Sequence, residues 1–167
     1  MRMRVKTVQA SEWREYREIR LAALKDAPSA FASTWQQEAA RSPEQWRERA
    51  ELSQDGLSQT IVVAVDDGGR WIGLAGGYRP GDDGADAELI SMWVAPDCRC
   101  CGVGQALARA VVSWAENHGS RVIGLWVNVA NHPGISLYER VGFCRTDEVA
   151  PLPSDPTQQE VRMLRNG

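Results

Sequence analysis

The chain has 167 residues, of which 43% are hydrophobic and 25% are charged, and its formal net charge is −3. This length supports a buried core in one domain over residues 1–167, and the composition excludes disordered and fibrous proteins. The acidic balance, without a dense block of Lys and Arg, argues against nucleic acid as a partner.

No apolar run approaches the roughly 20 residues that span a bilayer. The first ten residues, MRMRVKTVQA, lack the apolar core of a signal peptide. We therefore expect no membrane partner and a cytoplasmic location, in which the cysteines stay reduced.

The first half of the chain is predicted to alternate between strands and helices. A strand covers 3–9, Ser11 caps a helix that runs to about Lys25, and a short helix covers 35–40. Ser42 as N-cap and Pro43 in the first turn begin a further helix. Two strands follow, over 60–65 and 70–78, joined by the turn Asp-Asp-Gly-Gly at 66–69.

The second half continues this alternation. We expect a turn over 79–84, a strand over 85–96, a helix over 102–118 that stops at Gly119, a strand over 121–129 and a short helix that ends at Gly142. The last two strands, 142–149 and 160–165, are separated by the Pro-rich segment 150–157. This order predicts an α/β fold in which helices pack on a mixed sheet.

The segment CRCCGVG, Cys98 to Gly104, lies between a strand and a helix. Backbone N–H groups at a helix N-terminus are unpaired, and glycines let a phosphate approach them. Arg99 adds a charged hydrogen-bond donor. A tight turn without a ligand fits the same spacing. The segment lacks residues that the dinucleotide-binding motif and the P-loop require, so neither of these motifs is present.

The cysteines of this segment support a metal site or a reactive thiol less well than its glycines support a phosphate-binding turn. Cys98, Cys100 and Cys101 are crowded and form no Cys-x-x-Cys pair, so we expect no metal. No histidine stands where it would activate a thiol.

Two stretches together, MWVAPDCRCCGVGQALARAVVSWA and VNVANHPGISLYERVGF, resemble the GNAT superfamily of acyl-CoA-dependent N-acyltransferases. The family motif Arg/Gln-x-x-Gly-x-Gly/Ala reads here from Arg99 to Gly104. The second signature reads Asn131, Tyr138, Gly142 and Phe143. The resemblance covers about 87–143, and it implies a GNAT-like fold with a central, twisted, mostly antiparallel sheet and helices on both faces. The family has a Gly and then a basic residue where this chain has Cys100 and Cys101.

The resemblance implies a metal-free transfer of an acetyl group from acetyl-CoA to a primary amine, by direct attack in a ternary complex. A small-molecule acceptor is favoured, because a long loop over 148–160 would close over a small substrate. A peptide or protein acceptor stays open, as does a non-catalytic acyl-CoA-binding regulatory module. A homodimer also stays open.

Each step of this reaction has candidate residues. Tyr138 would hydrogen-bond or protonate the leaving thiolate, and Glu88 would take the proton of the amine. The alternative for Tyr138 is an aromatic residue of the core, and the alternative for Glu88 is a solvated charge at a strand edge. The residues implied for acetyl-CoA are Met92, Trp93, Val94, Arg99, Cys100, Cys101, Gly102, Val103, Gly104, Gln105, Asn131 and Tyr138. A bulge near Met92 would splay this strand from its neighbour and open a slot.

The acceptor side is predicted from the segments 26–38 and 148–160. The candidate substrate-binding residues are Phe31, Trp35, Tyr78, Glu88 and Trp126, although each aromatic also fits the core. The acidic run Asp82, Asp83, Asp86 and Glu88 would attract a protonated amine. His118 and His132 are weaker candidates for the general base.

Overall fold

The computed structural model describes residues 2–80 and 85–167. Within them the strands form one seven-stranded sheet in the order β1-β2-β3-β4-β5-β7-β6. The strands are β1 (Met3–Thr7), β2 (Gln59–Asp66), β3 (Trp71–Tyr78), β4 (Ala87–Val94), β5 (Val122–Asn128), β6 (Cys144–Leu152) and β7 (Asp155–Asn166). β4 and β5 pair in parallel, and every other neighbouring pair is antiparallel. The predicted fold class and element order are confirmed.

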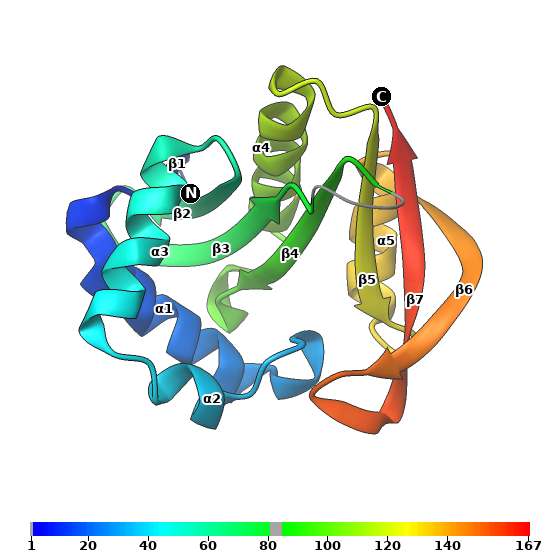
Figure 1. Ribbon diagram of the computed structural model, residues 1–167, viewed down its shortest axis with the longest axis horizontal. Helices are drawn as coiled ribbons and strands as arrows, with labels where there is room; N and C mark the ends of the chain where they lie inside the picture. The colour runs from blue at the N-terminus through cyan, green and yellow to red at the C-terminus, as the bar shows by residue number, and fades with distance from the viewer. Residues whose placement is uncertain (1, 81–84) are drawn as a thin grey trace.

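Helices cover both faces of this sheet (Figure 1). They are α1 (Trp13–Asp26), α2 (Trp35–Ala39), α3 (Pro43–Asp55), α4 (Val103–Asn117) and α5 (His132–Arg140), with short 3-10 turns η1 (Ala10–Glu12), η2 (Pro28–Ala30) and η3 (Pro96–Cys98). A Cβ atom on Gly73 or Gly77 of β3 would contact α4. The alternate residues Leu74 and Gly76 instead line a cavity together with side chains of α1 and α3.

The helix ends follow local capping chemistry. Ser42 caps α3 as predicted, since its hydroxyl accepts from the Gln45 N–H at 3.2 Å. The prediction of Ser11 as an N-cap is wrong, because the chain first makes the turn η1 and α1 begins at Trp13. Glu12 closes that turn by accepting from the Gln9 N–H at 3.0 Å.

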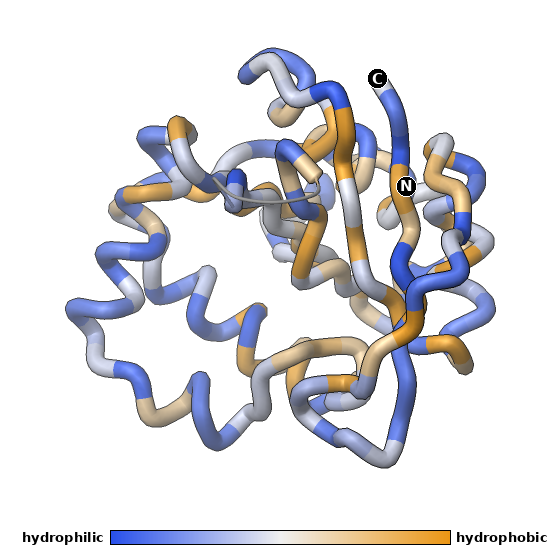
Figure 2. Tube along the Cα trace, turned by 45° about the vertical axis from the view of Figure 1, so that its right-hand side comes forward, coloured by the Kyte–Doolittle hydropathy of each residue, from blue (hydrophilic) through white to orange (hydrophobic). Residues whose placement is uncertain are grey.

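The hydrophobic core lies between the sheet and the helices. One apolar stripe of α4 faces this core, with Val103, Leu107 and Val111 each at most 1% exposed. In Figure 2 the hydrophobic residues gather along the central strands. None of the helices described here is long and apolar enough to span a membrane.

The C-terminal segment departs from its prediction. The long loop expected over 148–160 is wrong, because β6 runs to Leu152 and β7 begins at Asp155, leaving a two-residue turn. β6 is one of the two edge strands of the described sheet, where a proline such as Pro151 is tolerated because its missing N–H need not face a neighbour. The Ser154 hydroxyl at this turn donates to the Phe31 carbonyl at 2.5 Å, so the hairpin contacts the chain after α1.

Candidate active site

β4 and β5 are paired at one end of their length and diverge toward the other. Their register joins Ala87 to Ile123 and Glu88 to Gly124, and β4 then leaves its neighbour. The divergence coincides with a bulge, since Ser91 has a φ of 60° and the β3–β4 register shifts between Leu74 and Gly76. The predicted bulge is confirmed, and among the described residues it leaves the β5-facing edge of β4 after Glu88 without a strand partner.

The N-terminus of α4 meets the requirements of a phosphate site. Gly102 is the N-cap with a φ of 82°, and the first helical bond runs from the Ala106 N–H to its carbonyl at 3.0 Å. The N–H groups of Val103, Gly104 and Gln105 precede that bond and have no acceptor within the helix. A Cβ atom on Gly102 would meet nothing within 4 Å. This open turn therefore fits the pyrophosphate of CoA.

The second glycine of the motif has a different reason to lack a side chain. A Cβ atom on Gly104 would lie 3.0 Å from a methyl carbon of Leu137 on α5. Its small size therefore permits α4 and α5 to pack closely, while its N–H stays in the first turn of the helix.

Arg99 links the phosphate turn to α1 and β4. Its Nε donates to the Val94 carbonyl at 3.0 Å, and its guanidinium forms an ion pair with Asp26 at the end of α1. The Trp93 indole donates to the same carboxylate at 2.8 Å. These two donors lower the pKa of Asp26, the bond from Trp93 more than that from Arg99. No motif of the sequence points to Asp26 as a partner of Arg99, because Asp26 stands at the end of another helix.

Cys100 is strained at a position where the family has glycine. Its φ is 60°, in the left-handed region that costs a non-glycine residue roughly 1 kcal/mol. We expect Cys100→Gly to raise the free energy of unfolding by up to about 1 kcal/mol and to leave CoA affinity equal or higher. Chemical denaturation and calorimetric titration with CoA measure both quantities. The exposed neighbour Cys101→Gly is the matched control, and a Cys100→Gly protein less stable than that control contradicts this account.

Tyr138 and Asn131 belong to the helix that follows β5. The Tyr138 ring packs edge-on against Phe143, with the two ring centroids 6.0 Å apart, and burial alone raises the pKa of its phenol. The phenol therefore stays protonated at neutral pH and acts as a hydrogen-bond donor. The Asn131 side chain accepts from the Gly134 N–H at 3.0 Å and is the N-cap of α5.

Glu88 is a buried, paired carboxylate. It is 8% exposed, and both of its oxygens accept from the Arg162 guanidinium of β7, one of them at 2.7 Å. The carboxylate is therefore neither a solvated edge charge nor free of a counter-ion. Of the other acidic residues, Asp86 accepts from the backbone N–H groups of Arg121 and Val122, whereas Asp82 and Asp83 lie outside the described residues.

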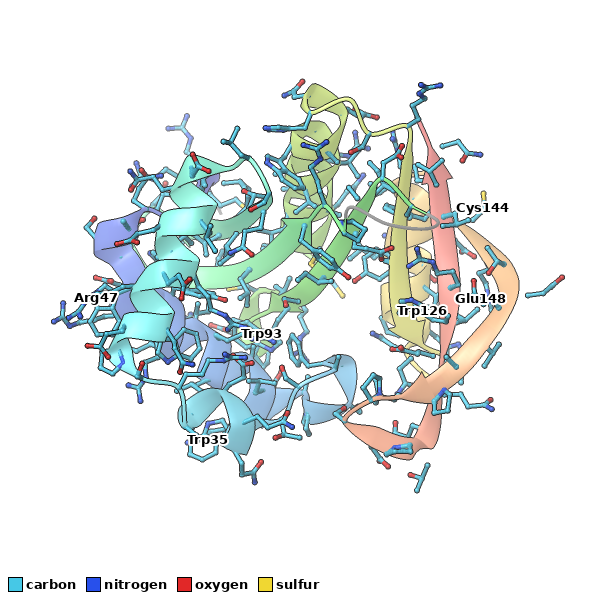
Figure 3. All side chains as sticks on the ribbon, viewed as in Figure 1. Trp35, Arg47, Trp93, Trp126, Cys144 and Glu148 are labelled. Atoms are coloured by element: carbon cyan, nitrogen blue, oxygen red, sulfur yellow. The ribbon has the colours of Figure 1, made fainter. Side chains whose placement is uncertain are left out.

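The predicted acceptor aromatics lie on the face of the sheet that carries α1 and α3. Phe31 is 3% exposed beneath the Arg20 guanidinium, and Tyr78 is 37% exposed. Trp126 comes from β5 with the Arg162 guanidinium 5.4 Å from its ring, whereas Trp35 comes from α2 at the lower edge (Figure 3). Tyr78 and Trp126 thus flank the Glu88–Arg162 pair, and Phe31 and Trp35 belong to the segment after α1.

Glu160 is a candidate that the sequence did not single out. It precedes Arg162 by two residues in β7, so both side chains lie on the same face of the sheet. It pairs with Asn128, at the end of β5 where the two parallel strands have diverged. Burial raises the pKa of Glu160, and no charged group of the described chain offsets this effect. A carboxylate with these properties suits a general base.

A model of the Acetyltransferase (GNAT) family matches residues 13–143. The chain belongs to this family. It is 31% identical over 132 residues to a mycothiol acetyltransferase of Pseudarthrobacter chlorophenolicus, covering 77% of this chain and 38% of that protein. A mycothiol acetyltransferase of an Arthrobacter species is 32% identical over 129 residues, covering 75% and 37%. The chain thus spans less than half the length of these curated relatives.

Solved structures show the same GNAT fold. A GCN5-related N-acetyltransferase of Kribbella flavida superposes with a TM-score of 0.72 and 25% identity, over 99% of this chain and 98% of that one. The yncA protein of Salmonella typhimurium, solved with its cofactor acetyl-CoA, gives a TM-score of 0.78 at 18% identity, over 99% and 94%. Both likenesses extend over nearly the whole chain.

Proposed function

We propose that this chain transfers an acetyl group from acetyl-CoA to the primary amine of a small molecule, by direct attack in a ternary complex. The observation that carries the proposal is the open N-terminus of α4 beside the unpaired edge of β4. The family membership supports the reaction, and the mycothiol acetyltransferases among the relatives support a small acceptor.

The chain's own groups divide the work as follows. The α4 N-terminus and Arg99 bind the pyrophosphate, and the free edge of β4 near Met92 aligns the pantetheine arm. When bound, acetyl-CoA supplies the activated thioester. A backbone N–H at the bulge stabilises the negative charge that develops on the acyl oxygen. Tyr138 donates a hydrogen bond to the departing sulfur. Because its raised pKa opposes full proton transfer, its role is to stabilise the thiolate.

We favour Glu160 over Glu88 as the group that takes the proton of the amine. Both oxygens of Glu88 are engaged by Arg162, whereas Glu160 pairs with Asn128 at the end of β5 that has diverged from β4, without a counter-ion in the described chain. Glu88 then acts through Arg162, which it holds against Trp126.

A panel of amines tests this function directly. The full chain is incubated with acetyl-CoA and amino acids, polyamines, amino sugars and short peptides, and thiol release is measured. Turnover with small amines above the background hydrolysis supports the proposal. Turnover with peptides alone would instead indicate that the acceptor is a peptide or protein amine. Silence across the panel, with CoA bound in calorimetry, points to the non-catalytic acyl-CoA-binding module.

Gly102→Val tests the phosphate turn separately from the chemistry. A valine side chain would occupy the open space above the turn, and it would be strained at a φ of 82°. We expect CoA affinity to fall by at least about a hundredfold, as hydrogen bonds to charged groups are lost. Gly69→Val is the matched control, because Gly69 also has a positive φ and open space but lies in the β2–β3 turn. Equal CoA affinity of the two variants would refute the phosphate turn.

A further inference from the structure

A cavity of about 120 Å³ lies beneath α1 and α3, on the face of the sheet that carries the acceptor residues. Its polar lining includes Tyr16, Arg20, Arg49, Thr60, Tyr78 and Ser91. The volume is enough for the carboxylate or phosphate end of a small molecule together with its first few atoms. The proposed chemistry assigns no role to this space.

The charge around the cavity is positive. Glu38 is 1% exposed and lies within 4.0 Å of three guanidinium groups, those of Arg20, Arg41 and Arg49. It is the only carboxylate of the described chain in ion-pair distance of any of them. One negative charge thus faces three positive charges, and two of these three arginines line the cavity. Such a site favours an anion.

Arg20 in addition has an unused donor. The residue is 6% exposed, and one guanidinium nitrogen donates to the Ser33 hydroxyl at 3.0 Å. The other, Nη1, is buried without a hydrogen-bond partner. A buried donor without an acceptor is costly, and an anion in the adjoining cavity supplies one.

The cavity adjoins the reaction site through one residue. Ser91, which lines the cavity, is also the bulge at which β4 leaves β5. A molecule held by Arg20 and Arg49 therefore extends toward the edge of β4 where the acyl group is expected.

We propose that this cavity binds an anionic group, a carboxylate or a phosphate, of the acceptor whose amine is acetylated. The inference rests on the proposed function, for which it names the acceptor class: small amines that carry an acidic group. It adds a second charged group to the expectation from sequence, in which an acidic run attracts the protonated amine of the acceptor.

A comparison of matched acceptors tests the inference. We measure kcat/KM for L-alanine against L-alaninamide, and for phosphoethanolamine against ethanolamine, in the unaltered protein and in Arg49→Gln. The loss of one charged hydrogen bond predicts at least a tenfold decrease for the anionic member of a pair and less than a twofold change for the neutral one. Differences in amine basicity cancel in this ratio of ratios. Equal decreases for both members overturn the inference.

A binding arm keeps the test independent of turnover. Succinate and inorganic phosphate are titrated calorimetrically into protein saturated with CoA, so that the α4 N-terminus is already filled. Binding that is weakened at least tenfold by Arg49→Gln supports the cavity even if no amine is acetylated, which would reject the proposed function alone. Failure of both anions to bind the unaltered protein overturns the inference. The stronger of the two anions identifies the acidic group.

Arg47→Gln is the matched control on the same helix. Arg47 points away from the body of the molecule and pairs with the exposed Glu44 (Figure 3). Its removal is expected to leave anion binding unchanged. Arg20→Lys retains the buried charge but loses the forked donor geometry, so it should weaken the binding of either anion without unfolding the chain.

Discussion

Replacing Glu160 with Gln is expected to lower kcat/KM roughly a hundredfold at neutral pH, which is the lower end of the usual effect of a general base. The amide has nearly the same shape as the carboxyl group but cannot take the proton of the attacking amine. The measurement uses the best acceptor of the amine panel with saturating acetyl-CoA. CoA affinity should not change, because Glu160 lies in β7, away from the N-terminus of α4.

The pH dependence separates a base from a structural residue. Burial raises the pKa of Glu160 above its ordinary value of 4.5, so the rate of the unaltered enzyme should rise with pH through that raised pKa. Glu160→Gln should lack this rise. Tyr138→Phe is the informative companion, since it should turn over more slowly and yet keep the rise. A Glu160→Gln enzyme with the original pH profile would remove Glu160 from the mechanism.

The same substitution should also stabilise the fold. Because the folded state raises the pKa of Glu160, it prefers the neutral carboxyl group, and ionisation costs stability as the pH rises above the ordinary value of 4.5. Glu160→Gln removes that cost at neutral pH and changes nothing below the ordinary pKa. Thermal unfolding at both pH values measures the difference. A variant that loses both stability and activity would indicate a purely structural role.

The parts of the site that the sequence predicted depend on local rules. The turn at Gly102 follows from spacing and from the chemistry of a helix N-terminus, and the start of α3 follows from Ser42 and Pro43. The bulge near Met92 was expected from the family resemblance. In each case the residues that act together are within a few positions of one another, or within one element and its neighbour.

The parts that it missed depend on contacts between distant residues. Glu88 and Arg162 are 74 positions apart, and Asp26 and Arg99 are 73 apart. Alternation along β7 puts Glu160 on the same face as Arg162. Only the sheet order shows that β7 lies beside β5 and that β5 diverges from β4. The prolines of the segment 150–157 predict a loop, but an edge strand tolerates them. The edge position of β6 is a property of the whole sheet and cannot be read from this segment alone.

Glu38→Gln is expected to have the largest effect on stability. It leaves Arg20, Arg41 and Arg49 without their shared carboxylate, and breaking a buried ion pair on one side costs about 3 kcal/mol or more. For a chain of this length that lowers Tm by roughly 6–12 °C. Glu44→Gln is the matched control, because the Glu44–Arg47 pair is exposed and its loss should cost less than about 1 kcal/mol.

The pH dependence of this loss has the opposite sign to that of Glu160. Burial pushes the pKa of Glu38 upward, but the hydrogen bond from Arg41 and the charges of Arg49 and Arg20 outweigh burial and lower the pKa. The contribution of Glu38 is therefore present above the ordinary value of 4.5 and is lost as the pH falls through the lowered pKa. The Tm difference between the unaltered protein and Glu38→Gln should accordingly shrink in acid. A difference that is constant with pH would mean that packing, and not charge, sets the loss.

Glu38 also connects the stability of the fold with the anion cavity. Without its carboxylate three guanidinium groups are left uncompensated, and two of them, those of Arg20 and Arg49, line the cavity. Any anion that binds only the folded state raises Tm by mass action. Inorganic phosphate, added at constant ionic strength with CoA saturating, should therefore restore part of the Tm lost in Glu38→Gln. The same addition should raise Tm less in Glu44→Gln. Equal shifts in the two variants would mean that phosphate acts on the surface, and that the arginines of α1 and α3 serve the fold alone.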